Sequence, residues 1–308
     1  MTEFTARALH LLAALLLRVV PWSWLTGLAD LAARRMLRRN ARTACVTARN
    51  LELAYPELLP GERAQLRDAI VRGTARQALE TLRFWTRPHA ENLALITEVH
   101  GAALLDAAIA RGRGVIVVAP HFGNWELLNQ WLASRTPLAV LYAPPESEVG
   151  EAFLNRVRAA DGDAKRVTQV RAEASAVREL LRRLKDGGVV GILPDQQPKQ
   201  GEGEFAPFFG RPALTMTLLS RLAARTGAQV VIAWCERIET RGPRFALHLR
   251  TGPDAIAGAD LPASVAALNG AVEQVARRDP AQYQWTYKRF SLQPPGSGEG
   301  NPYWPDCY

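Results

Sequence analysis

The stretch "VIVVAPHFGNWELLNQ", residues 115–130, decides the fold that we predict for this chain of 308 residues. Four consecutive Val and Ile residues are typical of a strand that is buried on both faces of a sheet. Pro120 ends this strand, and a short polar segment follows it. Asn124 is a favourable residue for the position just before a helix, so we expect a helix over residues 125–133. A buried strand that leads directly into a helix is the repeating unit of α/β proteins.

The same alternation extends in both directions from this stretch. An amphipathic helix is predicted over residues 60–85, and further helices at 102–110, around 148–160, around 172–185 and in "ALTMTLLSRLAART". Strands are predicted in "ITEVHG", "PLAVLYAP", "GVVGILPD", "AQVVIAWCER" and "RFALHLR". We therefore expect an α/β fold with a mostly parallel central sheet that is covered by helices on both faces.

Composition limits the class of protein. Hydrophobic residues make up 48% and charged residues 22%, as in folded proteins. The net charge of +8 favours an acidic partner, either anionic lipid, nucleic acid or an acidic protein. The three cysteines, Cys45, Cys235 and Cys307, lack CxxC or Cys/His spacing, so we expect neither a disulfide framework nor a zinc site. A reducing compartment fits this cysteine usage best.

The N-terminus predicts contact with a membrane surface. An apolar run from Ala8 to Val20 is shorter than the about 20 residues that cross a bilayer, and no basic segment precedes it as in a signal peptide. Trp22 and Trp24 suit the headgroup boundary, and several arginines follow. The alternative is a buried helix with a solvated basic face. We divide the chain into a membrane-anchor and basic helical region (1–55), the α/β domain (56–293) and a flexible tail (294–308).

The first strand end carries a candidate catalytic pair. In open α/β sheets, ligands bind beyond the carboxyl ends of the strands, where His121 is expected. A bend at Gly123 would let Glu126, in the first helical turn, reach back to the imidazole. The carboxylate would then fix one ring nitrogen and leave the other as a general base. The alternative is a hydrogen-bonded structural histidine and a glutamate that suits a helix N-terminus.

A second strand end is predicted in "GILPDQQPKQGEGEFAPFFGRPALTM". Asp195 and Gln196 follow the apolar run, and the aromatic patch "FAPFFG" comes next. Polar groups beside apolar surface suit an amphiphilic substrate, although Asp after Pro is also common in turns. Arg211 would precede a helix N-terminus at "GRPALT", which makes an anion site another possibility.

Together these segments resemble a known family. "APHFGNWE" and "GILPDQQP…FFGRPALT", with "TGAQVV" and the late "QYQWTYKRF", are similar to the bacterial lipid A secondary acyltransferases, the lauroyl and myristoyl transferases of the lysophospholipid acyltransferase superfamily. The resemblance implies an enzyme at the cytoplasmic face of the inner membrane. Such an enzyme moves a fatty acyl group from acyl carrier protein to a hydroxyl of a lipid A precursor, with no cofactor or metal and no nucleic acid partner.

The resemblance also implies roles for individual residues. His121 and Glu126 would be the catalytic pair and Asp195 a substrate-site residue, whereas Ala143 stands where family members often have the arginine of a "YRP" segment. For the oxyanion we expect a backbone N–H near Gly123 or Asn124, or the side chain of Arg171 or Arg178. The positive charge would suit the phosphates of the lipid and the acidic surface of the carrier.

Three other functions stay open at this point. The first is acyl transfer to another glycolipid or a lysophospholipid, or from coenzyme A. The second is a metal-dependent hydrolase with His121, Glu126 and Asp195 as ligands. One histidine and two carboxylates are few ligands for a transition metal. The third is a non-catalytic protein that binds a membrane surface.

Overall fold

The computed structural model describes residues 2–142, 147–148, 151–153, 166–172, 174–239 and 242–308. Within these residues the central sheet has seven strands in the order β1-β9-β8-β2-β5-β3-β4. The strands β2, β3, β4, β5 and β8 run parallel, whereas β9 is antiparallel to β8 and β1 is parallel to β9. This confirms the predicted mostly parallel sheet. The strands are β1 (Ile96–His100), β2 (Val115–Val118), β3 (Leu138–Tyr142), β4 (Val167–Arg171), β5 (Val189–Ile192), β8 (Gln229–Glu239) and β9 (Arg244–Thr251).

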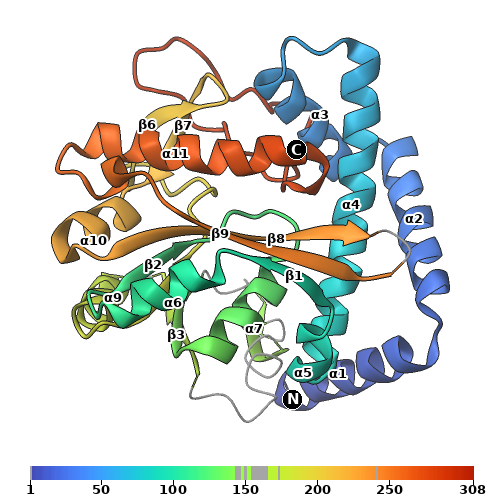
Figure 1. Ribbon diagram of the computed structural model, residues 1–308. Coiled ribbons are helices and arrows are strands. Elements are labelled where there is room, and N and C mark those ends of the chain that lie inside the picture. The colour runs from blue at the N-terminus through green and yellow to red at the C-terminus, as the bar shows by residue number, and fades with distance from the viewer. Residues whose placement is uncertain (1, 143–146, 149–150, 154–165, 173, 240–241) are drawn as a thin grey trace.

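Helices cover both faces of the sheet, as predicted (Figure 1). Successive strand residues point to opposite faces, so Ile116 and Val118 enter one core and Val115 and Val117 the other. The first core contains residues of α9 (Ala174–Lys185), α10 (Leu218–Thr226) and α11 (Leu261–Arg278). The second contains residues of α6 (Ala102–Ala110) and α7 (Trp125–Arg135).

Four helices precede the sheet: α1 (Thr2–Val19), α2 (Trp22–Arg38), α3 (Arg42–Ala54) and α4 (Pro60–Thr86), followed by the short α5 (His89–Leu93). The long helix α4 packs against α1, α2 and α3, and α2 runs beside it in Figure 1. Val46 and Leu51 of α3 lie in the same core cluster as Ile116 of β2. Helix α3, which the expected division assigns to the N-terminal region 1–55, therefore shares a core with the sheet.

In the described part of the chain, no helix on its own is long and apolar enough to cross a membrane. The segment Arg7–Val19 and helix α2 meet the length and composition criteria only as a pair, and they are bent by 114° relative to each other. Both helices expose large apolar side chains. On α1 these are Phe4, Leu9, Leu11, Leu12, Leu15, Leu16 and Val19, and on α2 they are Trp24, Leu28 and Leu31.

One predicted helix is partly a hairpin. The segment "ALTMTLLSRLAART" begins in β7 (Arg211–Met216), which pairs with β6 (Gly203–Phe208), and only its second half forms α10. Phe209 and Gly210 connect the two strands with φ of 50° and 71°, the positive values that a two-residue hairpin turn needs. Arg211 therefore begins a strand, and the helix N-terminus expected there is absent. The helix expected around 148–160 falls largely outside the described residues.

The C-terminal segment, expected to be a flexible tail over residues 294–308, contacts the domain through Tyr303 and Cys307. The 3-10 helices η1 (Asp254–Ala257) and η2 (Pro280–Gln282) precede it. Tyr303 is buried, and its hydroxyl donates a hydrogen bond to Asn50 Oδ1 at 2.5 Å. Cys45 of α3 and Cys307 form a disulfide, with their Cα atoms 5.6 Å apart. The expectation that the cysteines form no disulfide framework does not hold for this pair, because the fold joins two cysteines that are 262 residues apart in sequence. Cysteine usage therefore no longer argues for a reducing compartment.

Candidate active site

Two neighbouring strand ends form the candidate site. The parallel strands β2 and β5 pair in a register that sets Val118 opposite Ile192. His121 and Asp195 each follow three residues after this pair, so the register brings them together. His121 Nδ1 lies 2.7 Å from Asp195 Oδ1, and the backbone N–H of His121 donates to Asp195 Oδ2 at 2.8 Å.

Asp195 is buried and uses both carboxylate oxygens on His121. Burial by itself would raise the pKa of Asp195. The charge of His121 and the hydrogen bonds from its ring and backbone outweigh burial and lower that pKa below its usual value. Asp195 therefore stays a carboxylate. It holds His121 in position, a different arrangement from the substrate contact that we expected.

The other ring nitrogen of His121, Nε2, lies next to the side-chain amide of Gln196. An Nδ1–H that donates to Asp195 leaves Nε2 as an acceptor, and Gln196 Nε2 lies 3.3 Å from it. The imidazole also packs edge-on against the ring of Trp125, with centroids 4.8 Å apart. A substrate hydroxyl that displaces the Gln196 amide would meet a lone pair on Nε2 that is ready to accept its proton.

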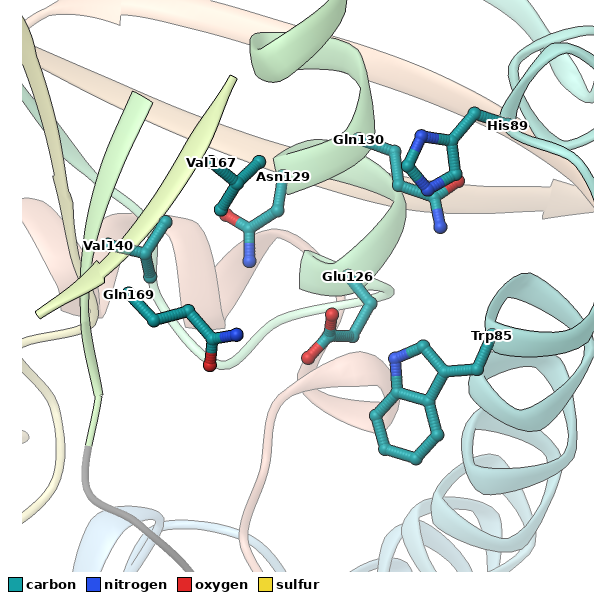
Figure 2. A pocket seen from close by; sticks show the side chains of 8 residues that line it. All are labelled: Trp85, His89, Glu126, Asn129, Gln130, Val140, Val167 and Gln169. Atoms are coloured by element: carbon teal, nitrogen blue, oxygen red, sulfur yellow. The ribbon is translucent and has the colours of Figure 1, made fainter. Parts of the chain in front are cut away.

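Glu126 lies in the first turn of α7 and is only 5% exposed. It lines a pocket together with Trp85, His89, Asn129, Gln130, Val140, Val167 and Gln169. Figure 2 shows its carboxylate among these side chains, between Trp85 and Gln169. The carboxylate at His121 Nδ1 is thus that of Asp195, in place of the expected Glu126. The helix begins at Trp125 and carries Glu126 toward the pocket, while the sheet register brings Asp195 to the imidazole.

The two backbone groups that we expected to bind an oxyanion are committed to the protein. Gly123 N–H donates to the Gln282 carbonyl and Asn124 N–H to the Cys235 carbonyl, each at 2.9 Å. The Asn124 side chain caps α7 by accepting a hydrogen bond from Leu127 N–H. Both residues therefore shape the loop that carries His121, and neither N–H is free for a substrate.

The arginines that we expected near the site either pair with glutamates elsewhere or are exposed. Arg171 ends β4 and pairs with Glu151, whereas Arg178 is exposed on α9. Arg211 pairs with Glu299 at 2.8 Å at the hairpin end. Ala143 lies outside the described residues.

Several residues near the site were not predicted. Tyr283 pairs with Phe122 across an isolated bridge, and Gln284 N–H donates to the His121 carbonyl. Burial raises the pKa of Tyr283, and the charge of Asp195 raises it further. Arg289 is buried and donates to Leu214 and Thr215, and burial lowers its pKa. The late "QYQWTYKRF" stretch contains Tyr283, Gln284 and Arg289. Its similarity to the family was the sequence feature that could have pointed to these residues. Among the described residues, no group of three or more His, Cys, Asp or Glu side chains could hold a metal ion.

Comparison with known proteins identifies relatives of this chain. The profile of the family described as bacterial lipid A biosynthesis acyltransferase matches residues 2–291. The chain is 26% identical over 270 residues to the lipid A biosynthesis lauroyltransferase of Escherichia coli K12, covering 88% of this chain and 85% of that protein. It is 27% identical over 270 residues to the palmitoleoyltransferase of the same organism, covering 86% and 83%.

A shorter match reaches a different glycolipid enzyme. The phosphatidylinositol mannoside acyltransferase of Mycobacterium tuberculosis CDC 1551 is 28% identical over 153 residues, which is 49% of this chain and 47% of that protein. The family profile spans nearly the whole chain and includes both strand ends that form the site. The chain is an acyltransferase and belongs to the bacterial lipid A biosynthesis acyltransferase family.

Proposed function

We propose that this enzyme transfers a fatty acyl group from the thioester of acyl carrier protein to a hydroxyl of a lipid A precursor, with His121 as the general base. The observation that carries the proposal is the hydrogen bond between His121 Nδ1 and Asp195, which leaves Nε2 able to accept a proton. This arrangement is that of a histidine base held by a carboxylate, with no nucleophilic side chain of the protein required.

The reaction proceeds by direct attack. His121 Nε2 takes the proton of the acceptor hydroxyl while the hydroxyl oxygen forms a bond to the thioester carbonyl carbon. The tetrahedral oxyanion then collapses, the carbon–sulfur bond breaks, and the imidazolium returns the proton to the leaving thiolate. Asp195 stabilises the imidazolium between the two proton transfers, because its pKa is lowered and it remains charged.

Gln196 and Glu126 are the residues that we place against the substrates. The Gln196 side-chain amide lies 3.3 Å from Nε2, so its N–H groups are within reach of the oxyanion that forms beside that nitrogen. Glu126 opens into the pocket beside α7, where we propose that its carboxylate contacts a substrate. The residue thus keeps a catalytic role, by contact with substrate in place of contact with His121.

We also propose that the enzyme works at the cytoplasmic face of the inner membrane, with α1 and α2 lying on the bilayer surface. Val19 and Trp24, beside the bend between the helices, are each 70% exposed and belong to the larger set of exposed apolar side chains on α1 and α2. Grouped apolar surface of this kind marks a contact site. The arginines that follow in α2 and α3 would contact anionic headgroups, lipid phosphates or the acidic carrier.

A transfer assay with a choice of donors tests the proposal. Purified enzyme is incubated with a radiolabelled lipid A precursor and either lauroyl carrier protein or lauroyl coenzyme A. We expect product with the carrier donor and at least tenfold less with coenzyme A. Failure of transfer from both donors would contradict the proposed function, and equal rates would contradict the proposed donor.

A second acceptor is favoured by one specific observation. The match to the phosphatidylinositol mannoside acyltransferase covers about half of this chain, so a phosphoglycolipid is the alternative acceptor. The same assay with that lipid in place of the lipid A precursor distinguishes the two acceptors.

A further inference from the structure

The loop that carries His121 is hydrogen-bonded along its length to the segment Gln282–Gln284. Gly123 N–H donates to the Gln282 carbonyl, and Gln284 N–H donates to the His121 carbonyl, both at 2.9 Å. A bridge between Phe122 and Tyr283 lies between these two bonds. Every residue from His121 to Gly123 is thus paired with one residue of this segment, so a displacement of the segment would displace the base.

The side chain of Gln282 fixes that segment to β8. Its Oε1 accepts from Arg237 N–H at 2.8 Å, and its Nε2 donates to the Arg237 carbonyl at 3.0 Å and to Asp279 Oδ2 at 2.8 Å. One amide side chain therefore pairs with both backbone groups of one strand residue. Such a two-bond contact allows only one relative position of the segment and the strand.

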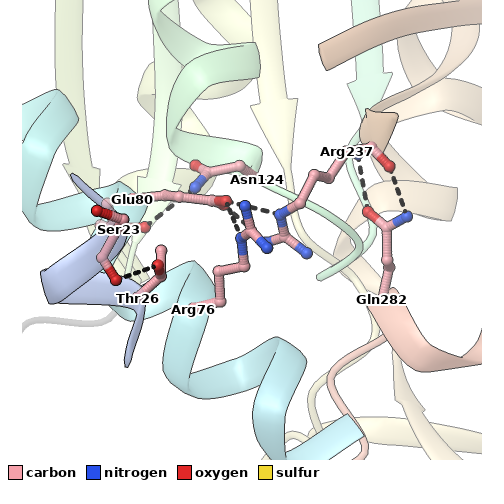
Figure 3. Close-up of polar contacts among 8 residues, drawn as sticks. Ser23, Thr26, Arg76, Glu80, Asn124, Arg237 and Gln282 are labelled. Atoms are coloured by element: carbon pink, nitrogen blue, oxygen red, sulfur yellow. Dashed lines mark hydrogen bonds and ion pairs between the residues drawn. The ribbon is translucent and has the colours of Figure 1, made fainter. Parts of the chain in front are cut away.

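Arg237 is in turn fixed by a buried carboxylate. Its Nε and Nη2 donate to the two oxygens of Glu80 at 2.6 and 2.7 Å, and Glu80 is fully buried in α4. Figure 3 shows Arg76 approaching the same carboxylate and Gln282 facing the backbone of Arg237. The next residue of α4, Thr81, accepts a hydrogen bond from Asn124 at 3.4 Å. Helix α4 therefore touches the catalytic loop directly and also through Arg237 and Gln282.

We propose that Glu80, Arg237 and Gln282 are positioning residues that hold His121 at the distance from substrate that proton transfer needs. The inference rests on the proposed role of His121 as the general base. The side chains act through the backbone of the loop and contact no reacting atom. Their loss is expected to slow the chemical step while leaving substrate binding intact, because a displacement of about 1 Å in a catalytic group costs on the order of 100-fold in rate.

The test variant is Gln282→Ala, and the matched control is Gln229→Ala. Gln229 is a partly buried glutamine at the opposite end of β8 that also bonds an arginine, Arg111. We expect Gln282→Ala to lower kcat by about 10- to 100-fold with KM within twofold of the wild type, and Gln229→Ala to leave both unchanged. A kcat for Gln282→Ala within twofold of the control would overturn the inference.

A measurement independent of activity separates this inference from the proposed function. The Nδ1 proton of His121, bonded to Asp195, gives a low-field proton NMR signal that reports the geometry of that bond. We expect Gln282→Ala to shift or broaden this signal and Gln229→Ala to preserve it. If the wild type transfers no acyl group, the proposed function fails, and the signal alone decides the inference. An unchanged signal in Gln282→Ala would overturn it.

A second variant covers the case in which Gln282→Ala does not fold. Gln282→Glu keeps the volume and the acceptor for Arg237 N–H, but replaces the donor to the Arg237 carbonyl with an oxygen. We expect the same loss of kcat and the same change in the signal. Retention of both wild-type values would overturn the proposed positioning role.

Discussion

A histidine acts as a general base only when one ring nitrogen can accept a proton and the ring is held in place. Asp195 meets the second need by accepting from both the ring and the backbone of His121, at 2.7 and 2.8 Å. Two bonds to one carboxylate fix the side chain relative to its own main chain. The single bond that Glu126 was expected to make would have fixed only the ring.

Asparagine at position 195 would keep the shape of the Asp195 side chain but would not orient the His121 ring in the same way. We expect Asp195→Asn to lower kcat by about 10³- to 10⁴-fold, as in other histidines held by a carboxylate, because the wrong tautomer becomes favoured. Steady-state kinetics would measure the loss, and the Nδ1 proton signal would disappear. As the comparison variant, Glu126→Gln should also lower kcat but keep this signal. If the signal disappeared in Glu126→Gln and stayed in Asp195→Asn, Glu126 would be the acid that orients His121.

The lowered pKa of Asp195 also links stability to pH. A carboxyl whose pKa is lower in the folded than in the unfolded chain stabilises the fold above its unfolded pKa of about 3.9. That stabilisation disappears as the pH falls through the folded pKa. We therefore expect the stability advantage of the wild type over Asp195→Asn to shrink below about pH 4. Urea unfolding at a series of pH values measures this, and an advantage that grows on acidification below pH 4 would contradict it.

At the scale of the elements, the loop from β2 to α7 needs glycine at position 123. Gly123 has a φ of 55°, and a Cβ there would lie 1.8 Å from the Cys235 carbonyl oxygen. Gly123 therefore lets the loop that carries His121 pass close to β8.

We expect Gly123→Ala to abolish activity and to lower the free energy of unfolding by more than about 2 kcal/mol, because both the backbone conformation and the space oppose a side chain. The control is Gly112→Ala, whose φ of 67° is similar but whose Cβ would meet nothing within 4 Å. It should cost only about 1 kcal/mol and keep activity. Equal losses in both variants would show that the contact with Cys235 is unimportant.

Helix α1 carries the element-scale prediction for the membrane. Leu12 and Leu16 are exposed and one helical turn apart. We expect Leu12→Glu with Leu16→Glu to lower binding to anionic liposomes at least tenfold in a flotation assay, because two charges replace apolar side chains at the lipid boundary. Leu59→Glu replaces a still more exposed leucine, the residue just before α4, and should bind like the wild type. Unchanged binding of the double variant would contradict the proposed membrane face.

For the whole molecule, the disulfide between Cys45 and Cys307 ties the C-terminal segment to α3. We expect one free thiol per denatured, unreduced chain, that of Cys235, and three after reduction. Cys307→Ser should lower the free energy of unfolding by about 2 to 5 kcal/mol, because the cross-link restricts the unfolded chain. Reductant should cause the same loss in the wild type and none in the variant. Three free thiols without reduction would contradict the disulfide.

The sequence predicted the features that depend on residues close together in the chain. The runs of Val and Ile gave the central strands, and the residues after them included both His121 and Asp195. Their pairing depends on β5 lying next to β2, and this sheet order leaves no periodic signal in the sequence. Spacing within one segment therefore favoured Glu126. The same limit applies to Cys45 and Cys307, and to Gln282, whose partners lie on β8 and in the catalytic loop.

The central claim is that His121, held by Asp195, is the base for acyl transfer to a lipid A precursor. The most direct test compares the rate of transfer from lauroyl carrier protein in the wild type and in His121→Ala, with circular dichroism to show that both are folded. We predict transfer by the wild type and a loss of at least 10³-fold in the variant. A folded His121→Ala enzyme that transfers at the wild-type rate would contradict the claim.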